Sequence, residues 1–467
     1  MPHLTRLPAD SVLTLSSTAV ATQMLNKEHG SIIRSPVALK SYLKAVALLR
    51  SMLDSDLQST YDEILPSIFM LEIFETISNI VGESEHTAVH QNAGMRTVQR
   101  AMSLNLKVDH STKRVASSLQ SRYVWTCFAT CAPAPLFAFE DRSYLGTCGE
   151  MDIFGAEICN ILHERDLLLT ITIASPSHLQ TPPPDSASAP ESSAPISALL
   201  LRTIRLLDDL KSYYDRLPLS WRPLRIPVTT PDFHPSIHIA GMYRSLCDVY
   251  SSLPTSHANA LYRIVRVAAL QTRWLLEQQL VILSAAGPIL FDPNADSYDT
   301  DADALGTGFD CQPEVQSLVD DICAAVPFHL GNRGASPISD STFRNSHDSE
   351  RGSMHPRRST VDVSTRLNHY PPSSSRLRNL THFVDEHGYA TSMTDAAHAS
   401  EASTKGGFMI LVPLNLLLIA FRRGAPLAKA TQLQSQPNPF ELREGQMEWI
   451  QSQLIRAATT QIRPLTG

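Results

Sequence analysis

Residues 406–423, GGFMILVPLNLLLIAFRR, constrain the fold more than any other stretch of the chain, because the fourteen residues from Phe408 to Phe421 carry no charge. A helix needs roughly 17–25 apolar residues to cross a bilayer, and shorter runs are typical of buried helices. Pro413 removes one helical hydrogen bond and kinks the helix unless neighbouring protein accommodates it. The run is therefore predicted to be a buried helix rather than a membrane anchor, with these residues in the core: Leu414, Leu417, Leu418 and Phe421.

The composition is consistent with a large core. The chain has 467 residues, of which 43% are hydrophobic and 18% are charged. This length suits one large domain or two ordinary ones. The net charge of −7 argues against broad, non-specific attraction to nucleic acid or anionic lipid. No secretory signal is recognisable at the start of the sequence, and no membrane association is expected.

The cysteines indicate neither a zinc module nor a disulfide framework. There are seven, none in a C-x-x-C pair, and both kinds of framework depend on regular spacing. Their neighbours are apolar, which is typical of buried free thiols in a reducing compartment. The positions are 127, 131, 148, 159, 247, 311 and 323.

Apolar residues recur at helical spacing along most of the chain, and strand-like alternation is scarce. The predicted fold class is all-α, a large multi-helix domain of packed helical hairpins. Predicted helices cover about 14–28, 41–53, 62–81, 85–104, 114–130, 150–174, 196–216, 236–252, 257–285, 312–326, the run at 406–423, and 440–459.

Three interruptions divide the helical pattern. Residues 175–195 and 292–310 are predicted to be flexible loops, because they contain too few apolar residues to offset the entropy of ordering. Residues 332–405, rich in Ser, Arg and His, are predicted to be a disordered insert. The expected organisation is an N-terminal helical segment, 1–34, followed by one interrupted domain, 35–462.

No residue pattern assembles an active site. His86 and His90 are four apart, as two zinc ligands on one helix face are, but Thr87 stands where the H-E-x-x-H motif has its glutamate. The phosphate-loop, dinucleotide-binding and nucleophile-elbow motifs are absent from the sequence. No catalytic residue, metal ligand or cofactor is therefore predicted. A helical metal enzyme that uses His86, His90 or His163 remains the alternative.

Two segments carry a resemblance to a known family. The helical stretch 320–334 contains Pro-Phe-His-Leu-Gly at 327–331, and the apolar run begins with Gly-Gly and has a central Pro-Leu. Together they resemble the fungal-specific regulatory domain that follows the binuclear zinc cluster in many fungal transcription factors. Pro327 is expected to end its helix. The residues that match are Pro327, Phe328, His329, Leu330, Gly331, Gly406, Gly407, Pro413 and Leu414.

The resemblance extends towards both ends of the chain. Residues 42–75 are similar to an early helix pair of the family, and 90–100, HQNAGMRTVQR, to a helix in which small residues permit close packing. Residues 446–462 look like its closing Trp-Ile helix, although Gln461 replaces the usual glycine. The matching positions here are His90, Ala93, Gly94, Trp449 and Ile450.

The resemblance implies a nuclear transcriptional regulator that is not an enzyme. Its expected partners are proteins of the transcription machinery or a DNA-binding partner, together with a small-molecule effector. Members usually carry a six-cysteine zinc cluster near the N-terminus, whereas the first cysteine here is Cys127. Direct DNA binding is therefore not expected. A truncated paralogue without activity of its own is a further alternative.

Overall fold

The structure is a computed structural model, and its contacts divide the chain into two compact units. The first comprises residues 1–160 and 458–467, and the second residues 161–457. The structure describes residues 8, 10–28, 35–53, 57–78, 97, 110–134, 146–174, 193–217, 221–227, 243, 246–285, 311–330, 382–384, 390–392, 402, 406–424 and 440–460.

The first unit is built from helices, as the periodicity predicts. Helix α1 (Val12–Glu28) packs against α2 (Pro36–Leu53) and α3 (Leu57–Ser78), and α3 also packs against α5 (His110–Thr130). The unit also contains the beginning of α6 (Gly146–Ala174). Since α1 packs on α2, contacts cross the domain boundary predicted at residue 35.

Apolar side chains from α2, α3 and α5 form the core of the first unit, with Leu49, Ile68 and Leu119 among those fully buried. An ion pair lies beside them, in which Arg122 of α5 reaches the buried Glu72 of α3 at 2.9 Å. Burial of each large apolar side chain contributes roughly 1.5–3 kcal/mol. Packing of apolar helix faces therefore accounts for most of the stability of this unit.

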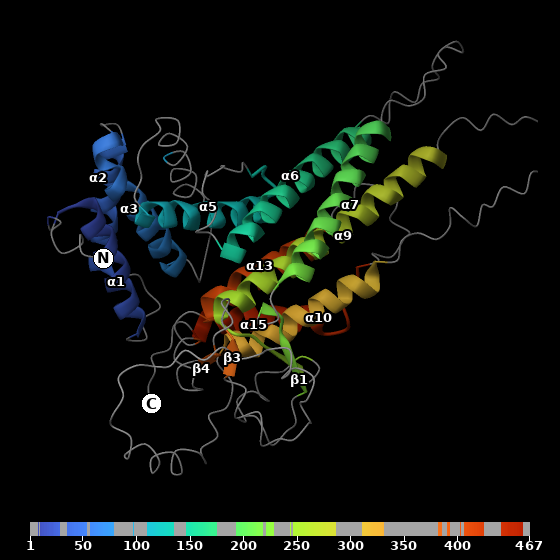
Figure 1. Ribbon diagram of the computed structural model, residues 1–467. Helices are drawn as coiled ribbons and strands as arrows, with labels where there is room; N and C mark the ends of the chain where they lie inside the picture. The colour runs from blue at the N-terminus through green and yellow to red at the C-terminus, as the bar shows by residue number, and fades with distance from the viewer. Residues whose placement is uncertain are drawn as a thin grey trace, which may run out of the picture. The chain divides into compact units, whose positions relative to one another are not determined.

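Helix α9 (Leu253–Ala285) is the central element of the second unit. It packs against α7 (Ser193–Arg216), α10 (Gln312–His329) and α13 (Gly407–Gly424) (Figure 1). The unit ends with α15 (Gln446–Thr460), whose residues up to 457 belong to it. The predicted all-α fold class is confirmed.

Helix α13 contains the apolar run and is buried as predicted. The four core residues named from the sequence are at most 6% exposed: Leu414, Leu417, Leu418 and Phe421. None of the described helices is long and apolar enough to cross a membrane.

The structure also shows how α13 accommodates Pro413, which lies inside the helix. Because proline has no N–H, the carbonyl of Met409, four residues earlier, receives no helical hydrogen bond from it. His257 of α9 supplies a donor instead, with Nδ1 2.8 Å from the Met409 oxygen. Since a carbonyl can only accept, this ring nitrogen must carry the proton.

Four short strands accompany the described helices. Strands β1 (Leu224–Pro227) and β2 (Leu246–Val249) pair antiparallel, with Arg225 opposite Asp248. The prediction of a helix over 236–252 is therefore wrong at residues 246–249. Strands β3 (His382–Val384) and β4 (Ala390–Ser392) also pair antiparallel, so the predicted lack of regular structure in the insert does not hold for these six residues.

Helix α10 does not end at Pro327 but continues to His329. The proline lies in the last turn, and the helix closes with a hydrogen bond from the Leu330 N–H to the Val326 carbonyl at 3.1 Å. The prediction that Pro327 ends the helix was wrong because a proline in the last turn removes only its own N–H donor.

Candidate functional site: a charged pocket on helix α10

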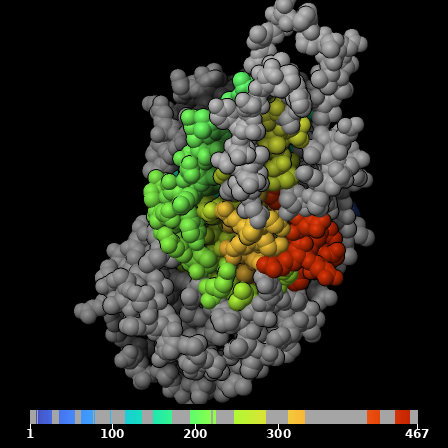
Figure 2. Space-filling view, turned by 90° about the vertical axis from the view of Figure 1, so that its right-hand side faces the viewer, coloured from blue at the N-terminus to red at the C-terminus, as the bar shows by residue number. Residues whose placement is uncertain are grey.

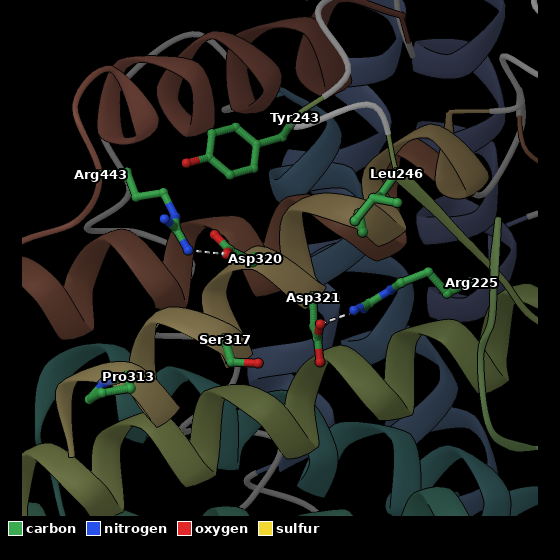
Figure 3. Close-up of a pocket in the computed structure, with 9 residues that line it drawn as sticks. Arg225, Tyr243, Leu246, Pro313, Ser317, Asp320, Asp321 and Arg443 are labelled. Carbon is green, nitrogen blue, oxygen red and sulfur yellow. Dashed lines mark hydrogen bonds and ion pairs between the residues drawn. The ribbon is translucent and has the colours of Figure 1, made fainter. Parts of the chain in front are cut away.

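A pocket of about 280 Å³ lies in the second unit, between α10, the β1–β2 ribbon and the turn that leads into α15. Figure 3 shows its lining, with Arg225 and Arg443 pointing towards α10 from opposite sides. Figure 2 shows α10 next to the C-terminal residues of the chain, on a face that the helix shares with them. The lining residues are Arg225, Tyr243, Leu246, Pro313, Ser317, Asp320, Asp321, Ala324 and Arg443.

One face of α10 forms the floor of the pocket. Its contributions are spaced at three, four or seven residues, which places them on one side of a helix. The opposite side of α10 packs into the core, where Val319, Ile322 and Cys323 are fully buried. This amphipathic pattern turns the other face of α10 towards the pocket. The α10 residues that line the pocket are Pro313, Ser317, Asp320, Asp321 and Ala324.

A buried ion-pair network holds one wall. Asp248 of β2, 0% exposed, accepts hydrogen bonds from Arg225 Nε at 2.8 Å and Arg225 Nη2 at 3.0 Å. It also accepts one from Arg263 Nη2 of α9 at 3.4 Å. Both arginines also pair with Asp321 of α10. Four elements, β1, β2, α9 and α10, are thereby linked through charged groups.

The charges in this network stabilise one another. The hydrogen bond to Asp248 is the main cause of a raised pKa for Arg225. Burial by itself lowers the pKa of Arg263, but the Tyr250 hydroxyl and the two carboxylates outweigh it, and the pKa is raised. Both guanidinium groups therefore stay charged at any physiological pH.

A second set of hydrogen bonds holds the opposite wall. Arg443 donates from Nη2 to Asp320 at 3.0 Å. The fully buried Gln446 donates to the other oxygen of Asp320 at 3.0 Å and accepts from the backbone N–H of Arg443 at 3.3 Å. Gln316 also donates to Asp320, at 2.8 Å. The aspartate and the turn that carries Arg443 are thus fixed together.

The remaining wall is aromatic and apolar. Tyr243 lies above Asp320 (Figure 3), and its ring is 5.5 Å from the ring of Trp449 in α15. Leu246 and Ala324 add apolar surface. The pocket therefore combines guanidinium and carboxylate groups with a hydrophobic side, the usual composition of a small-molecule site.

The structure brings two of the predicted motifs together, although about seventy-five residues separate them. Gly406 is buried directly before α13, and a Cβ atom added to it would overlap the His329 carbonyl oxygen at the end of α10. Only glycine permits this close approach. Phe328 packs beside it in the core, with its ring 5.6 Å from that of Tyr250.

The other predicted motif residues lie at several places. Leu330 caps α10, while Gly407 and Pro413 are buried in α13. Ile450 is fully buried in α15, whereas Trp449 is half-buried beside the pocket. Pro327 is buried in α10. The predicted residues outside the described part of the chain are His90, Ala93, Gly94 and Gly331.

Sequence reasoning did not find the pocket. The charged residues that line it come from three separate segments, and none matches a motif. The one local signal is Asp320-Asp321, two adjacent carboxylates in helix α10. Adjacent carboxylates repel unless cations lie nearby, but the pair does not show where such cations come from.

The described residues do not form the metal site that the alternative hypothesis requires. His163 is half-buried in α6, and His86 lies outside the described residues, as does His90. Among the residues that are described, no three His, Cys, Asp or Glu side chains gather closely enough to hold a metal ion.

Comparison of the chain with protein-family models, with curated proteins and with solved structures gives no match.

Proposed function

We propose that the protein is a transcriptional regulator of the fungal type, acting in the nucleus through a regulatory domain. Its partners are proteins of the transcription machinery or a DNA-binding partner, and a small molecule is its effector. The fungal-specific regulatory domain is the family that the sequence resembles.

The contact between Gly406 and His329 carries the proposal. The two motifs carry the resemblance as a pair in the sequence, and this contact supports a shared structural role for them. Their meeting also gives a reason for the glycine, because any other residue would collide with backbone.

A tethering experiment tests the proposal. The full chain is fused to a heterologous DNA-binding domain in a fungal reporter strain, and transcription is compared with that of the DNA-binding domain alone. We expect a change in reporter transcription. Replacing Gly406 by Ala should abolish that change, since inserting a side chain at a tight contact costs about 1–3 kcal/mol or more.

The fusion is also followed by immunoblotting and nuclear fractionation. A fusion that is intact and nuclear, yet leaves reporter transcription unchanged, contradicts the proposed function. Stoichiometric zinc or iron in the purified protein would instead support the metal-enzyme alternative.

A further inference from the structure

We propose that the pocket on α10 binds a small monocarboxylic acid with an aromatic or compact apolar body. This acid would be the small-molecule effector of the proposed function. Only its role as an effector rests on that function. Binding itself is a property of the pocket.

Unused donors on both arginines indicate an anionic group. Arg443 uses Nη2 for Asp320, and no hydrogen bond joins its Nε or Nη1 to a described residue. Arg225 uses Nε and Nη2 for Asp248 and Asp321, and its Nη1 likewise has no hydrogen bond to a described residue. Guanidinium N–H groups form charge-assisted hydrogen bonds with carboxylates. Both side chains are more than two-fifths exposed, so a ligand can reach them.

The described charges around the pocket favour a ligand with a single negative charge. Among the described residues, three arginines face three aspartates there: Arg225, Arg263 and Arg443 against Asp248, Asp320 and Asp321. A monoanion gains hydrogen bonds from the guanidinium groups. A dianion such as a phosphate ester would place a second negative charge beside the two carboxylates of the pocket floor.

The apolar wall and the volume limit the rest of the ligand. Tyr243 offers an aromatic ring, and Leu246, Pro313 and Ala324 offer aliphatic surface. Aromatic rings stack favourably on tyrosine. The volume of about 280 Å³ lies just below the roughly 300–1,000 Å³ typical of ligand sites. A ligand of one ring or a short branched chain suits this volume.

A ligand in the pocket would lie between Arg225 of β1 and Arg443 in the turn before α15, since both side chains line it. The same helix, α10, carries His329 at its far end, against Gly406. Helix α10 therefore carries both the pocket and the contact between His329 and Gly406.

The test is fluorine NMR of the purified full chain with 4-fluorobenzoate and 4-fluorophenylacetate as probes in the millimolar range. The neutral 4-fluorobenzamide, the cationic 4-fluorobenzylamine and inorganic phosphate are the comparison compounds. We expect saturable binding of at least one of the two acids and weaker binding of every comparison compound.

Two variants locate the site. Arg443→Gln should weaken binding of the acid by about tenfold or more, because it removes a charge-assisted contact. Arg202→Gln is the matched control, since Arg202 forms an exposed ion pair with Glu164 away from the pocket. It should leave binding unchanged. Thermal unfolding of both variants checks that each is folded.

Three results would overturn the inference: no saturable binding of either acid, equal or stronger binding of the amide, the amine or phosphate, or equal affinity in a folded Arg443→Gln variant. Because no transcription is measured, the result is separate from the tethering experiment. Binding without reporter activity would refute the proposed function alone, and reporter activity without binding would refute this inference alone.

Discussion

The hydrogen bond from His257 to the Met409 carbonyl predicts an energetic coupling between α9 and α13. The carbonyl depends on His257 because Pro413 cannot donate to it. In His257→Leu the carbonyl loses this donor inside the protein, which costs about 1–3 kcal/mol.

Replacing Pro413 by Ala should relieve that dependence. The alanine would carry an N–H that can donate to the Met409 carbonyl along the helix, so His257→Leu should cost less than about 1 kcal/mol in this background. The expected coupling between the two changes is therefore about 1–2 kcal/mol, within the range seen for residues that share a partner. The coupling compares the cost of His257→Leu in the parent with its cost in the Pro413→Ala background. The effect of Pro413→Ala by itself therefore cancels.

The free energies of unfolding of the parent, both single variants and the double variant are measured by urea denaturation. Leu49→Ala, in the first unit, replaces His257→Leu in the control cycle with Pro413→Ala. The two changes of this control should add within about 0.3–0.5 kcal/mol. If His257→Leu costs the same in the parent as in the Pro413→Ala background, the carbonyl does not depend on His257 and the reasoning is refuted.

Three further predictions concern buried groups. Burial raises the pKa of Asp152 to about 7 from an ordinary value of 3.8, so the folded protein holds an extra proton between these values. The free energy of unfolding should fall as pH rises through this window, and the fall should be smaller in Asp152→Asn. Asp248→Ala should cost about 3–5 kcal/mol by leaving the buried Arg263 short of a partner, against about 0–1 kcal/mol for the exposed Glu164→Ala; similar losses in urea melts would contradict this. Leu417→Ala should cost about 2–5 kcal/mol in the same assay, and a loss below about 1 kcal/mol would show that the site is not tightly packed.

The helices were predictable because each depends mainly on a local pattern. The run in α13 is uncharged over fourteen residues, which predicts its burial. The four core residues predicted from it are buried in the structure. Strand β2 was missed for the opposite reason. Its sequence, Leu246-Cys-Asp-Val249, has only four residues, too few for periodicity to distinguish a strand from a buried helix. It becomes a strand by pairing with β1, about twenty residues earlier.

The pocket could not be predicted because its charges depend on contacts between distant segments. Asp248 is 0% exposed, and its sequence neighbourhood does not show which cation would balance a buried carboxylate. Its partners, Arg225 and Arg263, come from β1 and α9. A sequence pattern shows which residues prefer the core, but the pairing of a buried charge depends on the tertiary fold.

The contact of Gly406 with the His329 carbonyl turns the chain between them into a loop whose ends are joined. The entropy lost in closing such a loop grows only with the logarithm of its length, and halving the length changes the cost by about 0.6 kcal/mol. The packing of α10 against α13 is therefore almost insensitive to how many residues connect them. Insertions or deletions that change the length of this connection would therefore leave the two helices able to meet.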